Sequence, residues 1–177
     1  CSSDLRCFCL QTIHTAMQSQ LGTLTLWCAP NLLHRHFRAV NKVFGIACQE
    51  QPQGDIGERM CHAAAMHFAQ TDAPPLLIIG TDCAVLGPGH LQEAARSLET
   101  ADVCLIPAED GGYVLIGMRK LIPEIFQEMA WSTSAVLAQT LARCTLVDAS
   151  VVQLPTLWDI DDPADWQRWQ AMCRLTH

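Results

Sequence analysis

The sequence predicts a single α/β domain built on a mixed, mostly parallel sheet. The chain has 177 residues, of which 50% are hydrophobic and 16% charged, a balance typical of one globular core. Short apolar runs alternate with segments of helical periodicity, and this alternation favours parallel strands joined by helices. No repeat or linker-like stretch divides the chain, so one domain is expected to span residues 1–177.

The apolar runs and periodic segments define the expected elements in order. Strands are predicted where the apolar runs are rich in branched residues, at residues 24–28, 43–48, 76–81, 103–107 and 113–118. Helices are predicted over residues 5–17, 91–98, 134–143 and 163–174, and a capping pattern at Asp55 predicts another through Phe68. Too few residues separate the last two strands for a crossover, so the sheet is expected to turn back there.

Charge and hydropathy exclude several classes of partner. The chain has 18 acidic and 11 basic residues, and its only lysines are Lys42 and Lys120. It therefore lacks the basic stripe that binds a phosphate backbone, and nucleic acid is not expected as a partner. No apolar run is long enough to span a bilayer and no signal-peptide pattern opens the chain, so neither membrane insertion nor secretion is expected.

The ten cysteines do not read as a disulfide framework. No CxxC pair occurs, and several cysteines lie in or beside apolar stretches, namely Cys28, Cys48, Cys83 and Cys104. Such residues are expected to be buried free thiols. Free thiols indicate a reducing compartment, so we expect the cytoplasm.

Four groups of polar residues and glycines follow or adjoin the predicted strands, and ligands of open α/β sheets lie beyond the carboxyl ends of strands. The first group is Gly80-Thr81-Asp82, after the most apolar run. A carboxylate there could hold a divalent ion together with substrate phosphates. Asp82 could equally cap the turn before Pro88, and both interpretations stay open.

The second group is the acidic segment from Trp158 to Asp165. If residues 157–161 are extended, Asp159 and Asp161 point to the same face, and two like charges side by side favour a bound cation. Asp162 precedes Pro163 at a helix start and is expected to be its N-cap. Asp165 falls in the first turn of that helix, where a negative charge is favourable.

The third group runs from Gly54 to Arg59. Asp55 and Glu58 have the spacing of a capping box, which alone could account for both acids. Gly57 is not explained by capping, and a glycine in the first turn lets a ligand approach the free amides. Arg59 adds a guanidinium for an anion or the edge of a base.

The fourth group, Glu109-Asp110-Gly111-Gly112-Tyr113, is by itself best read as a hairpin turn. Its adjacent glycines also permit a sugar or phosphate to lie against the backbone, with Asp110 accepting hydroxyl hydrogen bonds.

Several other kinds of site are excluded, and several conspicuous residues are expected to have structural roles. The chain has no GxxxxGK, GxGxxG or GxSxG motif, which removes P-loop, dinucleotide-binding and hydrolase-elbow sites. No motif places a histidine beside Cys83, so a buried thiol is expected there rather than a nucleophile. His34 and His36 are expected in a solvated loop, and packing roles are expected for Trp131, Trp166 and Trp169.

Taken in order, the segments GDIGERM, IIGTDC, EDGGYVLIG with WSTS after it, and WDIDDPADW resemble a known family. From about Leu10 to Trp166 the chain is similar to an uncharacterised bacterial family of the GT-A type nucleotide-diphospho-sugar transferase superfamily. That family is related to 2-phospholactate guanylyltransferase and the molybdenum cofactor guanylyltransferases. The resemblance implies a Rossmann-like, three-layer α/β/α fold with a mixed sheet.

The resemblance also implies roles for individual residues. Asp82 would bind Mg²⁺ or Mn²⁺, with Asp159 and Asp161 in the segment that supplies the second metal ligand, and Asp82 and Asp110 would be the catalytic candidates. The chemistry would be in-line substitution at phosphorus or at an anomeric carbon, without a covalent enzyme nucleophile. The residues implied to lie near the nucleotide or the acceptor are Gly54, Asp55, Gly57, Arg59, Gly111 and Gly112.

The chain departs from the family pattern in two places. Ala84 stands where the family usually has proline. Family members open with a strand and a loop of glycine, proline and lysine or arginine that holds the phosphates, whereas this sequence begins inside the helix that should follow. The usual first strand and phosphate loop are therefore expected to be missing, whether the chain is a fragment, a clipped product or a short variant. A second copy pairing across that gap, as a homodimer, is one hypothesis.

Three functions follow from these observations. The leading one is a metal-dependent nucleotidyl- or glycosyltransferase that uses a nucleoside triphosphate or a nucleotide sugar. The second is a degenerate member that binds a nucleotide or a partner without turnover, and the third is a structural or interaction domain that has kept only the fold.

Overall fold

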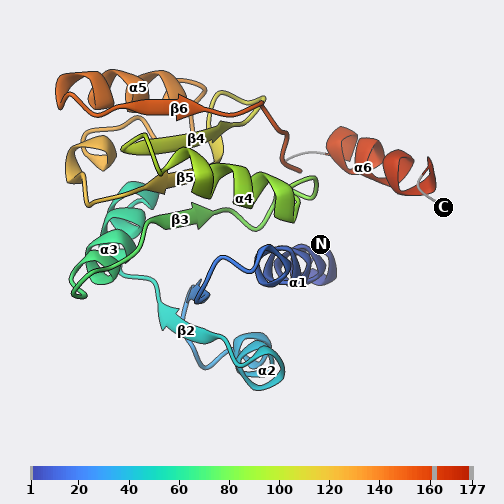
Figure 1. Ribbon diagram of the computed structural model, residues 1–177. Helices are drawn as coiled ribbons and strands as arrows, with labels where there is room; N and C mark the ends of the chain where they lie inside the picture. The colour runs from blue at the N-terminus through green and yellow to red at the C-terminus, as the bar shows by residue number, and fades with distance from the viewer. Residues whose placement is uncertain (1, 161–162, 176–177) are drawn as a thin grey trace.

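A four-stranded mixed sheet with the order β3-β5-β4-β6 lies at the centre of the molecule. The structure is a computed structural model that describes residues 2–160 and 163–175 (Figure 1). The strands are β3 (Leu76–Ile79), β4 (Val103–Pro107), β5 (Tyr113–Met118) and β6 (Val151–Gln153). β5 is antiparallel to both β3 and β4, and β4 is parallel to β6. Hence β3, β4 and β6 run in one direction, and their carboxyl ends lie at one edge of the sheet.

A second, two-stranded sheet consists of β1 (Thr25–Cys28) and β2 (Ala47–Glu50). These strands are parallel, with Thr25 opposite Ala47, and α2 (Arg35–Phe44) connects them. In Figure 1 this unit lies below β3, and within the described residues no hydrogen-bonded pairing joins the two sheets. The sheet is thus divided between its first two strands and the other four.

Helices cover both faces of the four-stranded sheet, because alternate side chains of β4 point into two separate cores. Cys104 and Ile106 pack against α4 (Pro88–Ser97). Val103 and Leu105 pack on the opposite side, against α3 (Ile56–Phe68), α5 (Val136–Leu146) and the short helix η1 (Pro123–Phe126). A strand buried on both faces must be apolar throughout, which explains the run VCLIP. The α/β/α layering that the sequence predicted is confirmed.

Two further helices lie outside these cores. α1 (Ser2–Ser19) packs beside α4, where the Gln92 side chain donates to the Ser19 carbonyl at 3.2 Å. α6 (Pro163–Leu175) stands to the right in Figure 1, and its Trp166 and Trp169 rings lie 5.8 and 5.4 Å from the ring of Phe8 in α1. The tryptophan packing predicted for α6 is confirmed. Within the described ranges no helix combines the length and the apolar character needed to cross a bilayer.

The sequence analysis misplaced one strand and missed three elements. Val43 and Phe44 do not begin a strand but end α2, and Gly45 closes that helix in the left-handed region with φ 67°. The strand starts later, at Ala47. His34 is the N-cap of α2, accepting from the His36 backbone N–H, so the loop predicted there is a helix start. The missed elements are α2 itself, a helix of ten residues, and the short segments η1 and β6, of four and three residues.

Asp102 ties together the amino ends of β4 and β6 and the carboxyl end of β5. Its Oδ2 accepts from the backbone N–H and the hydroxyl of Ser150, just before β6, at 3.0 and 2.9 Å. Its Oδ1 accepts from Arg119, just after β5, at 3.2 Å, and Lys120 lies 3.5 Å away. The hydrogen bond from the Ser150 N–H is the largest cause that holds the Asp102 pKa well below its ordinary value of 3.8.

We expect Asp102→Asn to lower the free energy of unfolding by roughly 1–3 kcal/mol at neutral pH, because charge-assisted hydrogen bonds are lost. The depressed pKa stabilises the fold above about pH 4, and this contribution is lost as pH falls through the folded-state pKa. Urea unfolding of both proteins between pH 3 and pH 7 should therefore show the difference narrowing in acid. Asp72→Asn, at an exposed turn residue, is the control; a pH-independent difference for Asp102→Asn would contradict this role.

Candidate active site

Three of the predicted groups meet at the carboxyl edge of the four-stranded sheet. Asp82 follows β3, Asp110 follows β4, and Asp159 follows β6. Backbone hydrogen bonds join the segments: the Ile160 N–H donates to the Asp82 carbonyl at 3.2 Å, and the Glu109 N–H donates to the Leu157 carbonyl at 3.1 Å. The carboxylates of the first, second and fourth groups are therefore carried by segments that touch one another.

Asp82 and Asp159 both lie near the thiol of Cys83. Cys83 is buried, its Sγ donates to the Trp158 carbonyl at 3.3 Å, and burial raises the pKa of this thiol to about 11. The carboxylates of Asp159 and Asp82 add to this rise, which they can do only from close by. Cys83 is thus the buried, protonated thiol that the sequence predicted.

The start of α4 does not need Asp82 as a cap. Its N-cap is Gly87, whose backbone N–H donates to Nδ1 of His90 at 2.9 Å. Asp82 is instead exposed, at the carboxyl edge of the four-stranded sheet. Of the two interpretations left open for Asp82, the geometry favours a ligand-facing role, which stays a prediction.

The acids at this edge have the donor chemistry that a hard divalent cation requires. Mg²⁺ and Mn²⁺ prefer carboxylate oxygens, commonly one or two from the protein together with substrate phosphates. Asp82 and Asp159 offer such oxygens on adjoining segments. In the described part of the chain, no three His, Cys, Asp or Glu side chains are grouped closely enough to hold an ion by themselves. Asp161 and the predicted N-cap Asp162 lie outside the described residues.

The turn between β4 and β5 is held by its own side chains and by the loop that follows η1. Oδ1 of Asp110 accepts from the Gly112 N–H at 2.7 Å, which confirms the predicted turn. Gly111 has φ +92°, and a Cβ there would overlap the backbone of Ser134. The Leu137 N–H also donates to the Gly111 carbonyl at 2.9 Å. The WSTS segment therefore packs directly on the glycine turn, and Gly111 permits that contact.

The third predicted group, residues 54–59, is connected to the turn at residues 109–112 through Trp131. The predicted capping box is present, since Asp55 and Glu58 each accept from the other's backbone N–H at 2.8 Å. Gly57 is buried, and a Cβ there would overlap the Trp131 indole. The close contact with Trp131 thus explains why residue 57 is a glycine, and the sequence did not indicate this contact. The nucleotide-binding roles of Gly54, Asp55 and Gly57 stay predictions.

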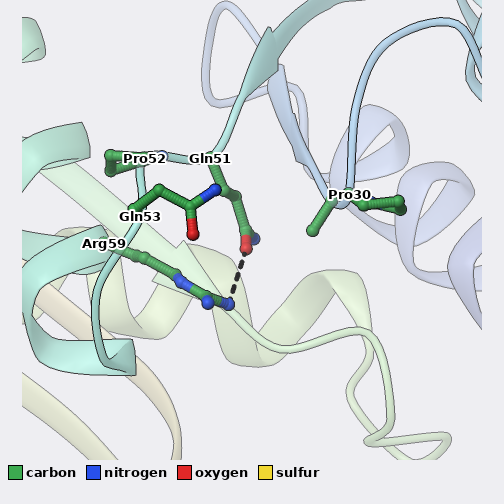
Figure 2. Close-up of a pocket in the computed structure, with 6 residues that line it drawn as sticks. Pro30, Gln51, Pro52, Gln53 and Arg59 are labelled. Atoms are coloured by element: carbon green, nitrogen blue, oxygen red, sulfur yellow. Dashed lines mark hydrogen bonds between the residues drawn. The ribbon is translucent and has the colours of Figure 1, made fainter.

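Arg59 lines a cavity that the sequence did not indicate. The cavity has a volume of about 400 Å³ and is lined by Ala29, Pro30, Gln51, Pro52, Gln53 and Arg59. Figure 2 shows the Gln51 and Gln53 amides turned toward the Arg59 guanidinium, with Pro30 facing them. The only sequence signal for this cavity was a proline shortly after each of β1 and β2. Ligands of open α/β sheets bind beyond the carboxyl ends of the strands.

A second feature missed from sequence is the link between α6 and the sheet edge. Arg168 makes a bidentate ion pair with Glu109, at 2.8 and 3.1 Å, and its guanidinium carbon lies 4.3 Å from the centre of the Trp158 ring. The hydrogen bond from Arg168 lowers the pKa of Glu109. One side chain of α6 thereby contacts the segments that precede Asp110 and Asp159.

Comparison with known proteins places this geometry in context. The profile of a family described as "Uncharacterized protein conserved in bacteria (DUF2064)" matches residues 12–133. A protein from Desulfovibrio desulfuricans G20, provisionally assigned as a nucleotide-diphospho-sugar transferase, has a similar structure with a TM-score of 0.76 and 25% identity. The similarity covers 89% of this chain and 68% of that one.

A second solved structure shows the same fold at low identity. It is a CMP:2-keto-3-deoxy-manno-octonic acid synthetase complexed with CTP, with a TM-score of 0.64 and 10% identity, over 96% of this chain and 88% of that one. No curated protein matches the chain. The Rossmann-like nucleotide-diphospho-sugar transferase fold implied by the resemblance is confirmed.

We expect Gly111→Ala to destabilise the protein by roughly 1–3 kcal/mol, because a side chain at positive φ is strained and would also push the Ser134 backbone away. Gly112→Ala is the matched control, since its Cβ would meet only the exposed Asp110 carboxylate, at 3.2 Å. Urea unfolding of the two variants measures the difference. Equal stability of the two variants would show that the WSTS segment does not depend on the glycine turn.

The raised pKa of Cys83 predicts that this thiol does not react with iodoacetamide at pH 7.5 in the folded protein. A thiol must lose its proton to react, and at that pH the fraction of thiolate is very small. Cys7, which is exposed, provides the internal comparison. Mass spectrometry after timed alkylation should find Cys7 modified well before Cys83, and equal rates would contradict the burial described.

Proposed function

Because the chain belongs to this family of uncharacterised bacterial proteins, we propose its function from its own site: a metal-dependent nucleotidyl- or glycosyltransferase. Its substrate would be a nucleoside triphosphate or a nucleotide sugar. The observation that carries the proposal is the meeting of Asp82, Asp159 and the 109–112 turn at the carboxyl edge of the sheet. The fold shared with a candidate sugar-nucleotide transferase and a CTP-bound synthetase supports it.

Asp82 and Asp159 are the residues that would hold the cation. Their segments are joined by the hydrogen bond from the Ile160 N–H to the Asp82 carbonyl, so the backbone holds the two residues close together. When bound, Mg²⁺ or Mn²⁺ would neutralise charge on the phosphate oxygens of the substrate. Asp161, which the sequence analysis also assigned to the metal, stays a predicted ligand.

Asp110 would bind the acceptor. One carboxylate oxygen is occupied by the Gly112 N–H at 2.7 Å, which fixes the direction of the side chain. Asp110 is exposed and lies at the same edge of the sheet as Asp82. In that position it would accept a hydrogen bond from an acceptor hydroxyl and orient it for in-line attack, so rate enhancement would come from positioning.

The proposal predicts nucleotide binding that requires metal and the two acids. Titration calorimetry and thermal shift of the full chain with nucleoside triphosphates and nucleotide sugars, each with and without Mg²⁺ or Mn²⁺, provide the readout. At 100 times its dissociation constant a ligand stabilises the native state by about 2.7 kcal/mol. We expect this shift to be lost in Asp82→Asn, and we expect the affinity for the nucleotide to fall at least tenfold in Asp159→Asn.

Asp148→Asn is the matched control, because Asp148 is an exposed acid that precedes β6 and so lies at the opposite end of that strand. It should bind as the unmodified chain does. Binding that is equally strong in EDTA, or that survives Asp82→Asn, would contradict a metal site at this edge. Metal-dependent binding without product in any donor and acceptor pair would instead favour a nucleotide-binding protein without turnover.

A further inference from the structure

The cavity beside Arg59 has walls of two kinds. Ala29, Pro30 and Pro52 are apolar, whereas Gln51, Gln53 and Arg59 supply polar groups. The volume of about 400 Å³ lies within the range of small-molecule sites. Compact apolar proline rings opposite hydrogen-bonding groups suit a planar heteroaromatic ring that packs on the prolines and is bound along its polar edge.

Gln51 is held rigidly at the back of this cavity. Its backbone N–H donates to the Cys28 carbonyl at 2.9 Å, and its side-chain Nε2 donates to the Trp27 carbonyl at 3.3 Å. With its nitrogen fixed in this way, the amide presents Oε1 to Nη1 of Arg59, also at 3.3 Å (Figure 2). The carboxyl end of β1 thus determines the position of the guanidinium through a single glutamine.

Arg59 can read only hydrogen-bond acceptors. A guanidinium has several N–H donors in a fixed plane and no acceptor. Nε of Arg59 is enclosed and has no partner in the structure as described, so a ligand would meet the terminal nitrogens. Arg59 is also the one charged residue among the described residues that line the cavity. A lone guanidinium between prolines is a poor site for a triphosphate but a good one for two neighbouring acceptor atoms on a ring.

Two adjacent acceptors distinguish the common bases. Guanine presents O6 beside N7, the pair that arginine reads most often, and cytosine presents O2 beside N3. Adenine places an amino donor next to each of its outer ring acceptors, and uracil places its N3–H between its two carbonyls. The exposed Gln53 amide offers both a donor and an acceptor for the remaining edge of either favoured base.

We propose that this cavity is the base-recognition site of the proposed transferase, and that Arg59, positioned by Gln51, selects guanine or cytosine over adenine and uracil. The inference rests on the proposed function but concerns a different part of the nucleotide from the metal-binding acids.

The test is titration calorimetry of the full chain with GTP, CTP, ATP and UTP in the presence of Mg²⁺. The better of GTP and CTP should bind at least tenfold more tightly than ATP and UTP. Arg59→Lys keeps the charge but loses the planar fork, and it should reduce that ratio to within about twofold while triphosphates still bind. Gln53→Ala, which changes only an exposed side chain, should reduce the ratio partially. Arg38→Lys, on the exposed face of α2, is the control.

The outcomes separate the two proposals. Equal binding of all four triphosphates, abolished by Asp82→Asn, would leave the transferase proposal standing and overturn base selection. Preference for ATP or UTP, or a tenfold preference that survives in folded Arg59→Lys, would also overturn it. If no triphosphate binds with Mg²⁺ or Mn²⁺, the proposed function fails, and base selection fails with it.

Discussion

The direction of β5 is the constraint on which the rest of the structure depends. Because β5 is antiparallel to both of its neighbours, β3 and β4 run the same way, and β6 joins them in parallel. Their carboxyl ends therefore open at one edge, and each is followed by an acid. If only one of these two pairings were parallel, β3 would place Asp82 at the opposite end of the sheet from Asp110.

Burial stabilises this arrangement from both sides. Val103, Leu105, Leu115 and Met118 are fully buried, so β4 and β5 cannot slip by one residue without turning apolar side chains toward the wrong core. The rigidity of these strands is transmitted to the short polar segments that follow them. A site of this kind needs little structure of its own, because the sheet has already fixed where each segment begins.

The sequence predicted the elements whose pattern is local and strong. β4 and β5 have the expected bounds, since a run buried on both faces contains little else than apolar residues. The capping box at Asp55 follows from the chemistry of a few neighbouring residues and is present. The 43–48 strand failed because Val40 and Phe44 also fit a helical spacing, and tertiary packing decided between the two patterns.

The candidate site was predictable only where a residue follows a strong strand. Asp82 and Asp110 were found in that way, but the contacts of Gly57 with Trp131 and of Gly111 with Ser134 join segments far apart in the chain. No local pattern encodes such contacts. Gln51 and Pro30 escaped notice for the same reason, since their significance depends on two loops meeting around a cavity. Gly57 and Gly111 belong to the predicted motifs and are also packing residues. The motif pattern alone does not reveal the packing role.

The contact of Arg168 with Glu109 gives α6 an ionic connection to the carboxyl edge of the sheet. Both side chains are about half exposed, at 46% and 55%, and exposed pairs are screened over a Debye length of about 8 Å at physiological salt. The packing of Trp166 and Trp169 on Phe8 is apolar and is not weakened by salt in this way. α6 is therefore anchored to α1 by a salt-insensitive contact and to the turn at residues 109–112 by a salt-sensitive one. Raising the ionic strength would therefore weaken the ion pair of α6 with Glu109 more than the packing of α6 on α1.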